Sequence, residues 1–418
     1  MIDIKYIREH SDIVRKKTRD KGVRIDIDKI LKLDEKRRKL IQEVEGLKAE
    51  KNKLAYSPRS GSAFRETKDI NKAKKIKDKI KKLEPELGKI EKEFNDLMFR
   101  VPNLPLNDVP VGKDEKSNLV MKNVGIRTKF SWKPKDYLEI AEGIDIIDVK
   151  RAAKVSGSRF GYLKKEAALL EFALINLALD VLTKQGFIPI VPPIMIKSKM
   201  AKGMGYLEQL GEKEAYFLSK DDLYLAGTAE QSIGPMHADE IFQEKELPKR
   251  YAAFSTCFRR EAGSYGKDTK GIFRVHQFDK VEMFSFCKPE DSIKEHKFFL
   301  SLEEKLMKLL KIPYRVIQVC SGDLSAPSAS TYDIESWMPG QNEYRETHST
   351  SNCTDFQARR LNIRYRSKKG INFVHTVNGT AFAIGRTIIA IIENYQTKNG
   401  TVEIPKILQK YIEIREIK

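Results

Sequence analysis

The sequence predicts an α+β protein in which a long N-terminal helical hairpin precedes a larger domain built on a mostly antiparallel β-sheet. Three observations support this prediction. Apolar residues repeat in steps of three and four across residues 29–99, and a proline-rich segment follows at 101–112. The rest of the chain interleaves helical and β-rich runs without a regular βαβ repeat. We therefore expect two domains, residues 1–104 and 105–418.

Residues 29–99 carry the pattern of two long helices. In the first helix, leucine recurs every seven residues, at Leu33, Leu40, Leu47 and Leu54. In the second, a coiled-coil seam joins Ala73, Ile76, Ile80, Leu83, Leu87, Ile90, Phe94 and Leu97. The stretch SPRSGS at 57–62 has the composition of a turn, so the helices should form an antiparallel hairpin. We expect Pro85 to kink the second helix without breaking it, because the seam keeps its phase on both sides.

The first hundred residues hold more than half of the net positive charge. They carry 30 basic and 19 acidic side chains, whereas the whole sequence carries 78 and 59. Nine of the basic residues fall between Arg65 and Lys82, against three acidic ones. Such a segment favours a polyanionic partner, with nucleic acid first and an acidic membrane surface second. A solvated helical surface is the alternative.

Composition also argues against several classes of protein. No apolar run approaches the ~20 residues that span a bilayer, so we predict no membrane partner or integral segment. The first residues lack the apolar core of a signal peptide and are too acidic for an organelle transit peptide. The four cysteines form no C-x-x-C pair, which argues against zinc ribbons and disulfide frameworks. We therefore expect a cytoplasmic protein.

Within the second domain we expect a helix over 169–186 that ends at Gly186. The next run, 187–196, is β-branched but contains three prolines, so it suits an edge or interface strand. Residues 251–263 and 273–287 indicate two strands around a glycine-containing loop, and 384–396 indicates a buried helix. Together these elements fit a mostly antiparallel sheet with packed helices.

The predicted hairpin of 251–263 and 273–287 offers the chemistry of a nucleotide site. Alternation places on one face of its second strand Arg274, His276, Phe278, Lys280 and Glu282, and on a face of the first strand Arg259 and Glu261. Arginine forks suit phosphate, an aromatic ring can stack on a purine, and a carboxylate can hold an ammonium group. An exposed face with incidental charge pairs is the alternative. The P-loop, the dinucleotide-binding glycine motif and the nucleophile elbow do not occur.

At these residues the sequence resembles the class II aminoacyl-tRNA synthetases, in the form found in seryl-tRNA synthetases. Motif 2 is matched by FRREAGSYGKDTKGIFRVHQFDKVEMF, and motif 1 by KQGFIPIVPPIMI with its proline at Pro193. The serine loop is matched by GTAEQS, the metal and ATP segment by YRETHSTSNCTDFQARR, and motif 3 by NGTAFAIGRTIIAIIENYQ. The helical hairpin is similar to the tRNA-binding arm of that family, so the resemblance covers essentially the whole chain.

The resemblance implies a serine–tRNA ligase that forms seryl-adenylate from L-serine and ATP. It then transfers the seryl group to the 3′-terminal adenosine of serine tRNA, with selenocysteine tRNA as a further candidate. Arg259 would bind the α-phosphate, Phe278 would stack on adenine, and Arg386 would meet the γ-phosphate. With Glu346, the two arginines form the implied catalytic group. The implied ATP-binding residues are Arg259, Arg260, Glu261, Arg274, Val275, Phe278, Glu346, Thr347, His348, Ser349 and Arg386.

The other implied roles concern serine, magnesium, tRNA and a second subunit. Glu346 and Ser349 would hold Mg²⁺, and no zinc is expected. Glu282 would grip the serine ammonium within a set comprising Thr228, Ala229, Glu230, Glu282, Asn378 and Thr380. The tRNA-binding lysines would be Lys72, Lys74, Lys75, Lys77, Lys79, Lys81 and Lys82. Motif 1 implies a homodimer.

Three residues depart from the family pattern: Thr380 and His348 stand where serine is usual, and Ala381 where glycine is usual. These departures concern the shape of the serine pocket rather than adenylate formation. We expect Cys257 and Cys353 to be packing residues and His276 to be a hydrogen-bonded structural residue.

Two rival functions remain at this point. A relative that charges a carrier protein would lack the long arm, whereas this sequence has one. A non-catalytic RNA-binding paralogue would have lost the ATP-binding arginines, whereas Arg259, Arg274 and Arg386 are all present.

Overall fold

The computed structural model describes residues 1–55, 67–207, 214–262, 266, 268 and 270–418. The chain divides into two compact units. The smaller comprises Ile2–Arg19 and Val23–Val101, and the larger comprises Met1, Asp20–Gly22 and Pro102–Lys418. The predicted turn at 57–62 lies outside the described residues. Within the described residues, no helix is long and apolar enough to cross a membrane.

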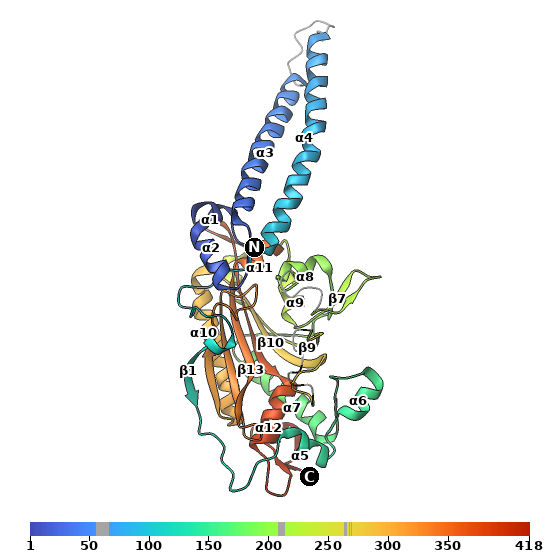
Figure 1. The fold of residues 1–418 in the computed structure, drawn as a ribbon, viewed down its shortest axis with the longest axis vertical. Helices are drawn as coiled ribbons and strands as arrows, with labels where there is room; N and C mark the ends of the chain where they lie inside the picture. The colour runs from blue at the N-terminus through green and yellow to red at the C-terminus, as the bar shows by residue number, and fades with distance from the viewer. Residues whose placement is uncertain (56–66, 208–213, 263–265, 267, 269) are drawn as a thin grey trace. The chain divides into compact units, whose positions relative to one another are not determined.

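The smaller unit is dominated by the predicted pair of long helices (Figure 1). After α1 (Ile4–Glu9) and α2 (Ser11–Asp20) come α3 (Ile27–Ala55) and α4 (Thr67–Arg100). Ile76, Ile80 and Phe94 of the predicted seam are buried. Ion pairs joining Lys29 to Glu93 at 2.7 Å, and Lys79 to Glu43 at 2.8 Å, establish that the helices are antiparallel. Helix α4 continues through Pro85.

The larger unit is built on an eight-stranded sheet that is antiparallel except at one edge. In spatial order its strands are β1 (Leu119–Val124), β11 (Tyr314–Gln318), β12 (Ser330–Met338), β13 (Glu343–Thr354), β16 (His375–Ala383), β10 (Gln277–Cys287), β9 (Lys249–Phe258) and β4 (Ile188–Ile190). Strand β4 pairs in parallel with β9 and forms the edge, as its prolines predicted.

Three long helices cover one face of this sheet: α7 (Lys165–Thr183), α10 (Ser292–Leu310) and α12 (Ile384–Asn394). Val281 and Met283 of β10 point into that core, whereas Phe284 and Phe286 belong to a second core on the opposite face. Alternation therefore assigns Lys280 and Glu282 to the opposite face as well.

Shorter elements surround the sheet. The helices are α5 (Tyr137–Gly143), α6 (Val149–Ser156), α8 (Ser198–Met204), α9 (Glu230–Ile233), α11 (Phe356–Leu361) and α13 (Gln409–Ile412). The short strands are β2 (Ile147–Asp148), β3 (Tyr162–Leu163), β5 (Met195–Lys197), β6 (Phe217–Leu218), β7 (Leu223–Leu225), β8 (Ile241–Gln243), β14 (Arg364–Ser367), β15 (Gly370–Phe373), β17 (Val402–Glu403) and β18 (Glu416–Ile417).

Several predicted element boundaries were wrong. Helix α7 begins at Lys165 and ends at Thr183, and Gly186, with φ of 80°, lies in the following turn. Strand β9 ends at Phe258, so Arg259 and Glu261 lie beyond it, and Glu261 has φ of 50°. Strand β10 begins at Gln277, after Arg274 and His276. The left-handed conformation of Glu261 is not that of an extended strand, and local alternation gives no sign of it.

Candidate active site

Arg259 occupies the junction between β9 and the loop that follows. Its backbone N–H donates to the carbonyl of His276 at 3.0 Å, so the two chain segments stay paired beyond the ends of their strands. Its Nε donates to the carbonyl of Gly227 at 3.1 Å, and its guanidinium lies 5.3 Å from the centre of the Phe278 ring. The predicted phosphate donor and the predicted adenine-stacking ring are therefore neighbours.

His276 is structural at this junction, as expected. Its Nδ1 lies 3.0 Å from the carbonyl oxygen of Arg259. The side chain of Arg260 turns elsewhere, because its Nε donates to the carbonyl of Ala215 and its guanidinium stacks on Tyr216 at 4.6 Å. Arg259 and Arg260 thus serve different neighbours although they are adjacent in sequence.

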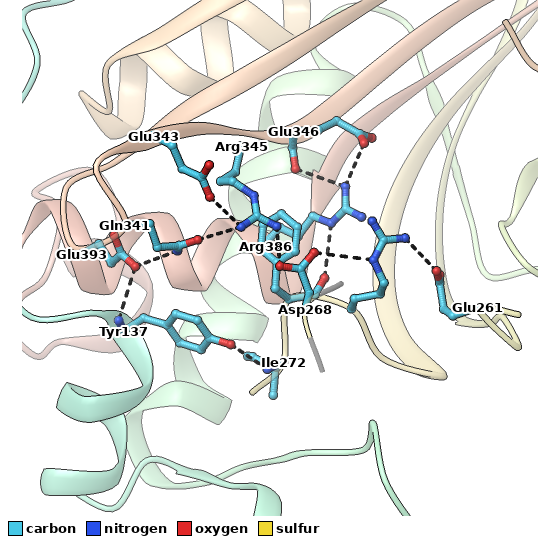
Figure 2. Close-up of polar contacts among 12 residues, drawn as sticks. Tyr137, Glu261, Asp268, Ile272, Gln341, Glu343, Arg345, Glu346, Arg386 and Glu393 are labelled. Atoms are coloured by element: carbon cyan, nitrogen blue, oxygen red, sulfur yellow. Dashed lines mark hydrogen bonds and ion pairs between the residues drawn. The ribbon is translucent and has the colours of Figure 1, made fainter. Parts of the chain in front are cut away.

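Arg386 and Glu346 meet where α12 faces β13 (Figure 2). Arg386 Nη1 donates to the backbone carbonyl of Glu346 at 3.1 Å and lies 3.2 Å from its Oε2. Desolvation raises the pKa of Glu346, but Arg386 and two further arginines bring it below its ordinary value. Glu346 is therefore a carboxylate at neutral pH, and half of its side chain is open to solvent.

The segment after Glu346 alternates between the core and the sheet face. Thr347 is buried and shares a hydrogen bond with Ser336 at 2.8 Å, and His348 is buried against the Phe382 ring. Burial lowers the pKa of His348 to about 4, so this histidine is neutral. Because the Thr347 side chain is buried, Thr347 could contact a nucleotide only through its backbone.

Ser349 lies beside a buried acid that the sequence analysis did not single out. Ser349 and Asp333 are paired across β12 and β13, and the serine hydroxyl donates to the Asp333 carboxyl. Asp333 Oδ1 is buried and accepts no hydrogen bond from any described residue. Burial and the nearby Glu346 charge raise the pKa of Asp333 well above its ordinary value. A group of oxygen donors with one unsatisfied member fits a hard divalent cation such as Mg²⁺.

Glu230, Glu282 and Thr380 come together on the same face of the sheet. Glu282 is ion-paired with Lys280 at 2.5 Å, and Thr380 Oγ1 donates to Glu282 at 3.4 Å. All four side chains are at least nine-tenths buried. Buried charges need partners, so this cluster is suited to receive a cation from a ligand.

Other predicted pocket residues flank this cluster. Thr228 is buried, and its hydroxyl has no hydrogen-bond partner among the described residues. Asn378 Nδ2 donates to the sulfur of Cys353 at 3.7 Å, so Cys353 supports a pocket residue by packing, as expected. Tyr206, which the sequence analysis missed, donates its hydroxyl to Glu230.

The arm lysines divide into two groups within their own unit. Lys72 and Lys79 pair with Glu50 and Glu43 of α3, at 2.9 and 2.8 Å. The other predicted tRNA-binding residues are exposed and form no ion pair with a described residue: Lys74, Lys75, Lys77, Lys81 and Lys82. These five side chains are the ones available to a polyanion.

Comparison with known proteins bears on both units. The family profile "Seryl-tRNA synthetase N-terminal domain" matches residues 1–105, and "tRNA synthetase class II core domain (G, H, P, S and T)" matches residues 216–395. A serine–tRNA ligase of Dictyoglomus thermophilum is 47% identical over 422 residues, covering 100% of this chain and 99% of the relative. The chain belongs to the seryl-tRNA synthetase family. The predicted family and fold class are thus confirmed.

Solved seryl-tRNA synthetases have the same fold over the full length. The enzyme of Pyrococcus horikoshii, complexed with ATP, has a TM-score of 0.92 and 41% identity, covering 100% of this chain and 99% of its own. The cytoplasmic serine–tRNA ligase of Naegleria fowleri, in complex with AMP, has a TM-score of 0.88 and 33% identity at the same coverage. A prolyl-tRNA synthetase of Giardia lamblia, at 16% identity, shares the fold only.

Sequence reasoning missed several residues that lie beside the predicted site residues. Asp333 and Tyr206 come from segments without a recognised motif, and only the tertiary structure places them beside Ser349 and Glu230. Arg345 was passed over, although it precedes Glu346 in the metal and ATP segment. Its guanidinium stacks on Phe273 at 3.9 Å, and Arg386 stacks on the same ring at 4.8 Å. Asp268, in the motif 2 loop, forms an ion pair with Arg345.

Proposed function

We infer that this chain is a serine–tRNA ligase that activates L-serine with ATP and transfers the seryl group to tRNA. Full-length identity of 47% to a serine–tRNA ligase carries this conclusion. The geometry supports it, because buried carboxylates on the sheet face lie near a group of arginines. Arg259 lowers the pKa of both Glu230 and Glu346, so its charge reaches both parts of the site. ATP–pyrophosphate exchange across all twenty amino acids tests the activity and its substrate.

The ATP site is assigned to the arginines and the aromatic ring of the sheet face. Arg259 binds the α-phosphate, Phe278 stacks on adenine, and Arg386 receives the γ-phosphate. Glu261, Arg274 and Val275 complete the motif 2 contribution, whereas the side chain of Arg260 would have to leave Ala215 and Tyr216 to join them. The 5.3 Å approach of Arg259 to Phe278 supports this assignment, because one nucleotide can touch a ring and a guanidinium so placed.

Adenylate formation needs positioning and charge neutralisation more than proton transfer. The serine carboxylate, already ionised, attacks the α-phosphorus in line, and pyrophosphate leaves. The arginines lower the repulsion between the two anions, and the fixed site reduces the entropic part of the barrier. A ribose hydroxyl of the terminal tRNA adenosine then attacks the mixed anhydride. The class II fold favours the 3′-hydroxyl.

Glu346 and Ser349 would hold Mg²⁺, with the Asp333 carboxyl behind Ser349. When bound, the cation would neutralise charge on the triphosphate. The unsatisfied Asp333 Oδ1 and the half-exposed Glu346 carboxylate support this assignment.

Serine binding is assigned to the cluster around Glu282. Glu282 and Glu230 hold the ammonium group, and Thr228, Asn378 and Thr380 line the pocket, with Ala229 contributing through its backbone. A pocket that hydrogen-bonds the serine hydroxyl rejects alanine, because its own polar groups would be left unpaired. The unpartnered Thr228 hydroxyl supports this proposal.

Serine binding should weaken as the pH falls below neutrality. Burial raises the pKa of Glu230 to about 7, and the Glu282 charge adds to the effect, whereas Lys280, Tyr206 and Arg259 oppose it. Protonation removes a charge that attracts the ammonium, so the KM for serine should rise roughly fivefold between pH 8 and pH 6. The pH profile of exchange at saturating ATP measures this, and Glu230→Gln should flatten it.

A change in protein stability cannot produce the same pH profile. Lowering the pH should weaken serine binding, whereas it increases the contribution of a carboxyl such as Glu230 to folding stability. A carboxyl whose folded pKa exceeds its unfolded value stabilises the fold fully only at low pH, and that contribution falls as the pH rises through 7. A KM for serine that is constant from pH 6 to pH 8 in the unsubstituted enzyme would contradict the assignment of Glu230.

Serine tRNA is the macromolecular partner, with selenocysteine tRNA as a second candidate for the same arm. The exposed lysines of α4 support binding of an RNA backbone, which is read by charge and shape. Charging assays with the two purified tRNAs test this. We place the protein in the cytoplasm, the compartment named for the Naegleria fowleri relative. We also propose residues 1–104 and 105–418 as the tRNA-binding and catalytic domains.

We propose a homodimer formed through motif 1. Helix α7 and the region of edge strand β4 expose large apolar side chains: Leu169 is 45% exposed, Phe172 61%, Ile188 49% and Val191 79%. An apolar cavity of about 300 Å³ lies beside them, lined by Pro192, Pro193 and Met236 among others. An apolar group of this kind at a sheet edge is typical of a protein interface.

Phe172→Glu should convert the dimer into monomers, because a buried unpaired carboxylate at the interface is costly. Sedimentation velocity at micromolar concentration measures the change. The control is Val155→Glu on α6, which introduces the same charge at a 71% exposed apolar residue outside the apolar surface of α7 and β4. A dimer that survives the first substitution, or a monomeric unsubstituted protein, would refute the proposed interface.

A further inference from the structure

Asp268 bridges two arginines at the edge of the ATP site (Figure 2). Its Oδ1 lies 2.6 Å from Arg345 Nη2, and its Oδ2 lies 3.6 Å from Arg274 Nε. All three side chains are about three-quarters buried or more. Asp268 has φ of 47°, a left-handed conformation that costs energy outside glycine, although aspartate tolerates it better than most residues.

Arg345 is held in place by contacts that do not involve Asp268. Its Nη1 donates to Gln341 Oε1 at 2.8 Å, and Gln341 in turn donates to the buried Glu393 at 2.8 Å. The guanidinium also stacks on Phe273. Arg345 would therefore keep its position if Asp268 moved away, with Nη2 free to bind another acceptor.

Arg274 is incompletely satisfied by the same carboxylate. Its Nη1 donates to Glu261 at 2.8 Å, but its buried Nε donates to no described atom, because Asp268 Oδ2 is too distant for a hydrogen bond. A buried N–H without an acceptor costs free energy. A ligand oxygen that came within hydrogen-bond distance of Arg274 Nε would remove this cost.

Carboxylates and phosphates are alternative acceptors for a guanidinium fork. The proposed function places Arg274 and Arg386 at the triphosphate, and Arg345 shares the Phe273 ring with Arg386. A carboxylate between Arg274 and Arg345 therefore occupies a position where the outer phosphates would find their donors.

We propose that Asp268 is an internal competitor of the triphosphate, and that the outer phosphates of ATP replace it at Arg274 and Arg345. This inference rests on the proposed function of the ATP site. It makes Arg345 a phosphate-binding residue and gives Asp268 a negative effect on the affinity for the phosphates. Because pyrophosphate leaves from the same donors, Asp268 also favours product release.

Glu343 provides the matched control. It pairs with Arg345 Nη1 at 2.9 Å, so it neutralises the same arginine, but its side chain is 52% exposed and it has no ion pair with Arg274 among the described residues. Glu343→Gln removes the same charge as Asp268→Asn from a position that does not bridge the two arginines.

The test is binding of inorganic pyrophosphate, with MgCl₂ held constant, measured by isothermal titration calorimetry. Asp268→Asn should tighten binding roughly five- to tenfold and lower the KM for ATP in exchange by a similar factor, as expected for removing one competing, partly buried ion pair. Glu343→Gln should change binding less than twofold. The gain should disappear when Arg345→Gln is added to Asp268→Asn, because the freed donor is then missing.

Each outcome is decisive. Unchanged or weaker pyrophosphate binding by Asp268→Asn, with an unaltered melting temperature, would overturn the proposal. If the substitution lowers the melting temperature, pyrophosphate binding is measured at a temperature at which both proteins are fully folded, and unchanged or weaker binding by Asp268→Asn there would also overturn the proposal. Failure of the unsubstituted enzyme to bind pyrophosphate or ATP would refute the proposed ATP site itself.

Discussion

Arg259→Ala should lower serine-dependent ATP–pyrophosphate exchange about a thousandfold, because in the proposed site it removes a donor to the α-phosphate oxygens on which charge develops. Arg274, Arg345 and Arg386 are each paired with a carboxylate of the chain. Arg259 has no ion pair with any described residue and lies against a carbonyl oxygen and the Phe278 ring. Its charge is thus the one already available to the α-phosphate.

The loss should appear mainly in kcat, because a donor that meets developing charge acts more strongly in the transition state than in the ground state. Arg366→Ala, which removes an exposed arginine from β14, is the matched control and should leave exchange unchanged. Circular dichroism and the melting temperature check that both variants are folded. Exchange within tenfold of normal in folded Arg259→Ala would show that the α-phosphate has another ligand.

The elements that sequence predicted well are those whose signal is local and repeated. The hairpin seam spans many turns, so one misjudged residue does not change the prediction, and Ile76, Ile80 and Phe94 are buried as expected. The edge position of β4 followed from its prolines, which cannot donate to a ladder on both sides. The family was recognised because the types and order of the motif residues are specific.

The features that sequence could not predict depend on distant partners. Strand β9 ends at Phe258, and Glu261 in the segment that follows has a left-handed conformation, although the sequence predicted that the strand continues through it. The N–H of His276 pairs with the carbonyl of Arg159, more than a hundred residues away, rather than with β9. Asp268 and Arg345 become neighbours only when the motif 2 loop meets β13, and nothing in the spacing of 77 residues indicates it.

Replacing residues 29–99 with a short turn should spare adenylate formation and abolish tRNA charging. All residues assigned to ATP and serine belong to the larger unit, whereas the arm has its own buried seam and its own ion pairs. Exchange should therefore remain within a few-fold of normal. Charging at limiting tRNA should fall more than about a hundredfold, because the proposed arm would supply the phosphate-binding charges that dominate RNA affinity.

A charge variant separates the effect of the lysine charges from the effect of the arm as a whole. Changing Lys74, Lys75, Lys77, Lys81 and Lys82 to glutamine leaves the hairpin ion pairs intact, so α3 and α4 should stay paired. The dependence of tRNA affinity on salt should become shallower by roughly 0.9 for each phosphate that the arm no longer neutralises.

Lys72 and Lys79 are the control pair, because Glu50 and Glu43 already neutralise them, and their replacement should change the salt slope less. Full-rate charging by the armless protein, or an unchanged salt slope in the five-lysine variant, would mean that the tRNA is held elsewhere.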